Sequence, residues 1–179
     1  MTVTDKGIGL LKKYAGDIAL EALALAVGMA LLLWYNTAND GALRVLLWPH
    51  AKATEAFYHL SLHYQSGVGY VAAGGGFAIG PACMGMNFIV MLFCLMVCAF
   101  TRRFRGMRKA VFFVLALVDS SVAGVIVSCI RIVGSVPLLS LKQFATIHTG
   151  MGIALYMVAL VGSYILVNKV TGGLYEKHQ

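Results

Sequence analysis

Charged residues are scarce in this sequence of 179 amino acids. They make up 12% of the chain, hydrophobic residues make up 60%, and the mean hydropathy is +0.83. An ordinary soluble domain has about 25% charged residues, so this composition excludes that class. The chain has only three prolines, and its 20 glycines are unevenly placed, which excludes a disordered or collagen-like protein. The apolar runs approach the roughly 20 residues that cross a bilayer. The sequence therefore predicts an all-α polytopic membrane protein, with residues 1–179 forming one integral-membrane domain.

Cysteines and acidic residues are also few. The chain has four cysteines, and Cys94, Cys98 and Cys129 fall inside predicted apolar helices, where packing is expected and a disulfide framework is not. Seven acidic residues stand against 14 lysines and arginines, which gives a net charge of +7. Because these cations gather in loops, we interpret them as a membrane-topology signal and predict no nucleic-acid binding. Cys83 is the cysteine outside this pattern.

Four apolar segments predict transmembrane helices, at about residues 18–35, 84–100, 110–133 and 147–167. The first is interpreted as a retained span and not as a cleaved signal peptide, because it is long, contains Glu21 and lacks a clear cleavage site. Residues 101–109 hold five cations and no acid, which strongly indicates a cytoplasmic loop. We therefore expect a multi-pass protein of the cell membrane with both termini cytoplasmic.

The segment 36–82 is expected on the extracytoplasmic side and is less regular. Pro49 is expected to open a helix, and residues 51–64 mix polar and apolar side chains as an interfacial amphipathic helix does. Residues 67–80 contain six glycines. This composition disfavours a helix and favours an extended or re-entrant backbone.

The predicted topology brings three reactive side chains to one membrane level. Cys83 opens the second span, Arg131 lies near the outer end of the third, and His148 opens the fourth. A helix start favours a thiolate, a histidine exchanges protons near neutral pH, and an arginine at membrane depth is costly and fits an oxyanion. The three residues thus offer a nucleophile, a base and an anion stabiliser. The alternatives are packing for Cys83, capping for His148 and lipid anchoring for Arg131.

A second group of residues invites a metal-site interpretation. Glu55, His59 and His63 are spaced four apart, which would align three metal ligands on one helix face. They lack the His-Glu-x-x-His pattern, and a wet polar face explains them equally well. We therefore predict no metal and no cofactor.

Asp119 stands alone near the middle of the third predicted span. An ionised carboxylate there would be costly, so the group is expected to be protonated or paired, with Glu21 and Asn168 as candidate partners. Transporters use such residues. Asp119 therefore supports an alternative function, that of a small membrane transporter or channel subunit.

The residues around the three reactive positions resemble a known family. Residues 81–88 read Pro-Ala-Cys-Met-Gly-Met-Asn-Phe, Arg131 and Ile132 end a span, and residues 148–152 read His-Thr-Gly-Met-Gly. This order, spread over residues 67–168, resembles the exosortase and archaeosortase family, most closely the exosortase K type. The resemblance implies a cysteine transpeptidase that cleaves sorting signals. It implies Cys83 as nucleophile, Arg131 as essential cation and His148 as acid/base partner.

The resemblance also implies supporting residues and partners. The family commonly has serine after the nucleophile and asparagine three residues before the arginine, where this chain has Met84 and Ser128. Gly85, Asn87 and Ser128 are candidate substrate-binding or supporting residues. The implied partners are exported proteins with a C-terminal tripartite sorting signal, together with membrane lipids. The sorting motif and the acceptor nucleophile stay open.

Overall fold

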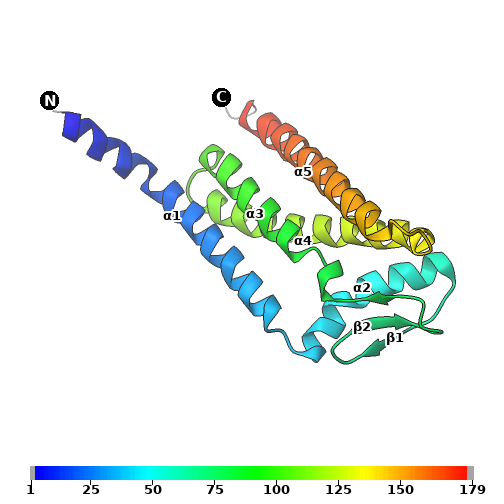
Figure 1. Ribbon diagram of the computed structural model, residues 1–179. Coiled ribbons are helices and arrows are strands. Elements are labelled where there is room, and N and C mark those ends of the chain that lie inside the picture. The colour runs from blue at the N-terminus through cyan, green and yellow to red at the C-terminus, as the bar shows by residue number, and fades with distance from the viewer. Residues whose placement is uncertain (1–2, 177–179) are drawn as a thin grey trace.

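The computed structural model describes the backbone of residues 3–176 and the side chains of residues 15–172. Its described part contains five α-helices: α1 (Val3–Asn36), α2 (Asp40–Tyr58), α3 (Met86–Phe100), α4 (Met107–Ser135) and α5 (Phe144–Glu176). Helices α1, α3, α4 and α5 belong to segments long and apolar enough to cross a membrane. The prediction of a mostly helical chain with four helices long and apolar enough to cross a membrane is therefore confirmed (Figure 1).

Helix α3 is the central span and packs against α1 and α4. Its Leu92, Phe93 and Phe100 side chains are fully buried. Lipid tails are as apolar as these side chains, so helices in a membrane associate through close packing and small residues. Gly28 of α1 provides such a close contact, because a Cβ there would lie 2.7 Å from the Val90 side chain. Gly124 of α4 packs in the same close way against the Ile89 side chain.

One end of the bundle carries the loop of residues 101–109, which we call the basic end. Arg103 crosses from this loop to α5, where it donates to Asn168 Oδ1 at 2.7 Å and to Thr171 Oγ1 at 3.0 Å. Two further cations pair with α1: Arg102 with Glu21, and Lys109 with Asp17. The free ends of α1 and α5 lie at this end too (Figure 1). The loop therefore also ties together the helices around it.

The opposite end, which we call the sheet end, holds α2 and a small antiparallel sheet. Strands β1 (Leu62–Gln65), β2 (Gly69–Ala72) and β3 (Ala78–Ile79) follow the order β1-β2-β3. Leu62 pairs with Ala72, and Tyr70 pairs with Ile79. The extended backbone predicted for the glycine-rich residues 67–80 is confirmed in β2 and β3. The sheet itself lies outside the all-α prediction.

Helix α2 differs from the predicted interfacial helix. It begins at Asp40, because the Asn39 side chain accepts a hydrogen bond from the Ala42 amide at 2.9 Å and caps the first turn. Pro49 lies inside this helix and does not open it. The helix ends at Tyr58, since His59 adopts a left-handed conformation with φ +52°. The prediction of one helix over residues 51–64 is therefore wrong at both ends.

Candidate functional site

Cys83 lies in a short 3-10 turn, Pro81–Cys83, between the sheet and α3. Its amide donates to the Gly80 carbonyl at 2.9 Å, and the Tyr35 hydroxyl of α1 donates to the Pro81 carbonyl at 2.6 Å. The cysteine is half-buried with a free thiol. Because α3 begins only at Met86, the prediction that Cys83 opens that helix is wrong. The turn, and not a helix N-terminus, positions the thiol.

Gly85 connects this turn to α3, and its position requires a residue without a side chain. Its φ of +72° is left-handed, and a Cβ would lie 2.5 Å from the Tyr156 hydroxyl and 2.6 Å from Ser128 Oγ. Ser128 is fully buried and donates to the Met84 carbonyl at 2.9 Å. Gly85, just before α3, and Ser128 of α4 thus fix the backbone beside Cys83. Gly85 has no reactive group, and the buried Ser128 hydroxyl is engaged by the Met84 carbonyl.

Arg131 reaches from α4 to the backbone of Cys83. Its Nη2 donates to the Cys83 carbonyl at 2.9 Å. The guanidinium carbon lies 5.2 Å from the centre of the Tyr156 ring, within the range of a cation–π contact. A Cβ at Gly152 would lie 3.1 Å from Arg131 Cδ, so α5 closes over the arginine side chain. These contacts hold the guanidinium beside Cys83.

His148 lies in the second turn of α5, one turn later than predicted, and is held by Ser135 of α4. Ser135 Oγ lies 2.7 Å from His148 Nδ1 and donates its hydrogen to the Arg131 carbonyl at 2.5 Å. A hydroxyl has one hydrogen, so Ser135 can only accept from the imidazole. This network assigns the hydrogen of the neutral imidazole to Nδ1 and leaves Nε2 as the proton acceptor.

His50 of α2 is a second imidazole near Arg131. It is fully buried, and in the described part of the chain neither ring nitrogen makes a hydrogen bond. Burial lowers the pKa of His50; the Leu46 backbone opposes this shift, and the Arg131 charge adds to it. Arg131 Nε is likewise buried without a partner in that part of the chain. Buried polar atoms normally have partners, so these three nitrogens are exceptions within a largely apolar core.

Sequence reasoning missed Ser135, Tyr156 and His50 as parts of this site. Ser135 and Tyr156 follow a helical spacing that is visible in the sequence. On α4 the site residues are Ser128, Arg131 and Ser135, and on α5 they are His148, Gly152 and Tyr156. Steps of three and four residues place each set on one helix face. Those two faces meet in the structure, whereas nothing in the local sequence of His50 indicates its position.

The structure joins Cys83 to Arg131, and Arg131 through Ser135 to His148; we call these four residues the Cys-Arg-His cluster. Among the described side chains, no hydrogen bond joins the Cys83 thiol to His148. Asn87 lies exposed in the first turn of α3. No hydrogen bond within residues 15–172 links it to the cluster. Asn87 is thus the candidate supporting residue that is not connected to the cluster.

The competing metal constellation is not formed. Glu55 lies in α2, where it accepts hydrogen bonds from Lys52 Nζ at 2.6 Å and from the Leu62 amide at 2.8 Å. His59 ends that helix and His63 belongs to β1, so the three side chains do not share a helix face. Over the described residues, no group of three histidine, cysteine or acidic side chains is arranged to hold a metal ion.

The partners suggested for Asp119 are engaged elsewhere. Glu21 pairs with Arg102, and Asn168 accepts from Arg103.

Cys94 packs against α1, with its sulfur 3.7 Å from the Ala24 carbonyl. Cys98 is exposed on α3 and does not pack as predicted.

Comparison of the chain with protein-family models, curated proteins and solved structures finds no match. The arrangement of side chains is therefore the basis for any functional assignment.

Proposed function

We propose that this chain is a membrane-embedded cysteine peptidase or transpeptidase that cleaves C-terminal sorting signals of exported proteins. One observation carries the proposal. Arg131 donates to the Cys83 carbonyl at 2.9 Å, while Ser135, one turn further along α4, holds His148 at 2.7 Å. Hydrogen bonds thus connect the Cys83 backbone to the Arg131 guanidinium, and the Arg131 backbone through Ser135 to the His148 imidazole. These three residues, from three distant segments, carry the thiol, the cation and the base that nucleophilic acyl transfer uses.

The proposed reaction uses the free Nε2 of His148 as the proton carrier. Nε2 takes the proton of the Cys83 thiol, and the sulfur forms a bond to the scissile carbonyl carbon. The carbon–nitrogen bond then breaks, and the Nε2 proton passes to the leaving amine. In the second step water or another nucleophile gives its proton to Nε2 and attacks the thioester. The acyl–oxygen or acyl–nitrogen bond forms, the carbon–sulfur bond breaks, and Cys83 regains its proton from Nε2.

Arg131 is proposed to stabilise the negative charge that develops on the carbonyl oxygen. Its guanidinium is already beside Cys83, and its Nε has no partner among the described residues. Donors held in place before the reaction act strongly where water is excluded. The buried ring of His50 adds a polar group near Arg131.

The sheet offers a place for the substrate backbone. The strand order β1-β2-β3 leaves β3 at an edge, and only Gly80 separates β3 from the turn that holds Cys83. An extended peptide that adds to the β3 edge would therefore run toward the thiol.

The cations of the basic end favour a cytoplasmic location for that end. The sheet end and Cys83 would then lie on the extracytoplasmic face, together with the exported substrate and the lipid headgroups of that face.

A transporter or channel subunit built on Asp119 is the alternative function. Conduction needs a path lined by polar groups. The cavity beside Asp119 is instead lined by apolar side chains, apart from Asp119, Arg108 and Thr171. The cluster around Cys83 offers more chemistry than this cavity, so the peptidase is favoured.

Replacement of Cys83 tests the proposal. An exported protein from the same genome that ends in a short motif, an apolar helix and a basic tail would be co-expressed as substrate. We expect Cys83→Ala to insert and fold normally but to release no tail and to form no hydroxylamine-sensitive thioester, because the acyl intermediate cannot form. Cys98→Ala, which removes an exposed thiol on α3, is the matched control and should cleave normally. Normal processing by Cys83→Ala would refute the enzyme.

A further inference from the structure

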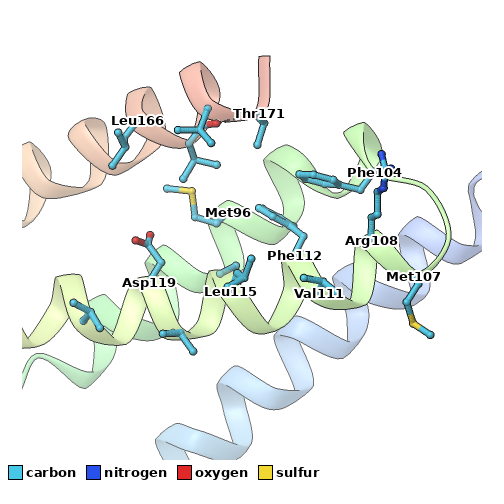
Figure 2. Close-up of a pocket in the computed structure, with 15 residues that line it drawn as sticks. Met96, Phe104, Met107, Arg108, Val111, Phe112, Leu115, Asp119, Leu166 and Thr171 are labelled. Atoms are coloured by element: carbon cyan, nitrogen blue, oxygen red, sulfur yellow. Dashed lines mark hydrogen bonds between the residues drawn. The ribbon is translucent and has the colours of Figure 1, made fainter. Parts of the chain in front are cut away.

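A cavity of about 700 Å³ lies between α4 and α5, away from the Cys-Arg-His cluster. The two helices meet near residues 136–144 and separate toward the basic end (Figure 1). Apolar side chains from three helices line the opening, among them Met96, Phe112, Leu115 and Leu166. The Asp119 carboxylate points from α4 toward α5 in this groove (Figure 2). We call it the Asp119 groove.

Asp119 is exceptional among the acidic residues of this protein. Five acidic residues have described side chains, and four of them have partners. These pairs are Asp17 with Lys109, Glu21 with Arg102, Asp40 with Ser66, and Glu55 with Lys52. Within residues 15–172 no cation or hydrogen-bond donor contacts the Asp119 carboxylate, which is exposed in the groove. The chain thus satisfies every described carboxylate except this one.

The depth of Asp119 makes the missing partner informative. Asp119 lies about 18 Å along α4 from its start at Met107, given a rise of 1.5 Å per residue, and so near the middle of a hydrocarbon core about 30 Å thick. A carboxyl group there is costly unless a polar group meets it. Phospholipid tails supply none, because the headgroups stay at the surface. A lipid in the groove would therefore leave Asp119 unsatisfied.

We propose that the Asp119 groove is the docking site for a transmembrane helix of a partner protein that carries a lysine or arginine at mid-membrane depth. Such a cation is costly on an isolated helix too, and the ion pair satisfies both residues. Arg108 lines the groove about 16 Å nearer the basic end, which favours an acidic or neutral helix end there. A helix with a basic tail at that end would be repelled. The partner is thus distinct from the proposed substrate, and the inference does not depend on cysteine chemistry.

Synthetic helices test this pairing directly. Three peptides of about 22 leucine and alanine residues would be compared: one with a central lysine, one with leucine there, and one with the lysine two turns away. Each carries an energy-transfer acceptor, and the full-length chain carries the donor, both in phosphatidylcholine vesicles. We expect the central-lysine peptide to associate at least about tenfold more tightly than the other two, as close charge pairs do.

Variants of the chain identify the residue responsible. Asp119→Leu should lose the preference for the central lysine, whereas Val118→Leu, at a neighbouring groove position, should keep it. Equal association of all three peptides with the unmodified chain would overturn the proposal, and this comparison needs no variant to fold. The proposal also fails if the preference survives in Asp119→Leu. Cleavage by the Cys83 reaction should be unchanged in Asp119→Leu, so failure here leaves the proposed enzyme untouched.

Discussion

Ser135 orients the His148 ring through its hydroxyl group. Its hydroxyl donates to the Arg131 carbonyl and accepts from Nδ1, which leaves Nε2 to carry protons. An aspartate in this position would also stabilise a charged imidazole. A serine orients the ring without that charge, so the imidazolium gives up its proton more readily. This arrangement suits the proposed step in which Nε2 passes its proton to the leaving amine.

The Ser135→Ala variant tests this role. We expect the protein to fold and the rate of tail release to fall about fivefold, because a neutral hydrogen bond stabilises by about 1 kcal/mol and about 1.4 kcal/mol corresponds to tenfold. Ser135→Thr keeps the hydroxyl and should restore much of the rate. Ser121→Ala, whose hydroxyl bonds to the Leu117 carbonyl within α4, is the matched control. Equal rates for Ser135→Ala and the unmodified chain would exclude an orienting role.

Arg131→Lys separates a site residue from a lipid anchor. Lysine keeps the charge and reaches lipid phosphates nearly as well. It lacks the planar fork that contacts the Cys83 carbonyl and lies over Tyr156. We expect normal expression and a loss of about 2.7–4 kcal/mol in transition-state stabilisation, the effect of removing one oxyanion donor.

The measurement for Arg131→Lys is the rate of tail release from the co-expressed substrate. Arg44→Lys, an exposed arginine of the sheet end, is the control and should cleave normally. A rate for Arg131→Lys close to the unmodified one would assign Arg131 to the membrane interface.

At the residue scale the sequence predicted part of this cluster. Cys83, Arg131 and His148 were predicted from their order and common membrane level, and the structure connects them through Arg131 and Ser135. Their chemical roles remain predictions. His50 was not identified because its burial depends on how α2 packs, which no local pattern specifies. Serine and tyrosine likewise have many ordinary uses in membrane helices, so Ser135 and Tyr156 carried no distinct signal.

At the element scale, two carboxylates of α2 hold the hairpin of β1 and β2. Asp40 accepts hydrogen bonds from the Ser66 hydroxyl, from the Gly67 amide at 3.1 Å and from the Tyr64 hydroxyl at 3.0 Å. These bonds lower the pKa of Asp40. Lys52 and the Leu62 amide lower the pKa of Glu55 in the same way. The sheet beside Cys83 is thus fastened by ionised groups.

This fastening predicts an acid-sensitive hairpin. A carboxylate whose pKa is lower in the folded state contributes stability above its unfolded pKa of about 4, and that contribution is lost as the pH falls through the folded value. We expect hydrogen exchange at residues 62–72 to rise as the pH falls below about 4, after correction for intrinsic rates. The Asp40→Asn variant should already exchange faster at pH 7. Acid-independent protection in the unmodified chain would contradict this account.

The elements of the sheet end were the least predictable from sequence. Asn39, which caps α2, is a residue type that is also common in turns. Pro49 lies inside α2, although proline is more typical of a helix start. Strand β3 has only two residues and β2 has four, too short for an alternating pattern to stand out. The glycines of residues 67–80 indicated an extended backbone. They gave no pairing partner.

At the scale of the whole molecule, the four spans were predictable and their packing was not. Length and hydropathy identify a span directly. Side chains that face lipid and side chains that face protein are equally apolar. The hydropathy of the sequence therefore does not show that α3 is the central helix. The salt bridges of the basic end are also a tertiary feature. Residues 101–109 indicated a membrane side, while the structure gives Arg102, Arg103 and Lys109 a second role in joining helices.

The proposal of an exported substrate depends on the predicted orientation of the molecule in the membrane. Lysines and arginines beside the spans are retained in the cytoplasm, and residues 101–109 carry five of them. In a cysteine-free background, we expect Ser140→Cys, exposed between α4 and α5, to react with a membrane-impermeant maleimide on intact cells. Met107→Cys, at a position 81% exposed at the basic end, should react only after permeabilisation. Together they separate the two faces, since both positions are accessible in the folded chain. The reverse pattern would place the Cys-Arg-His cluster in the cytoplasm and remove exported proteins as its substrates, even if the cysteine chemistry held.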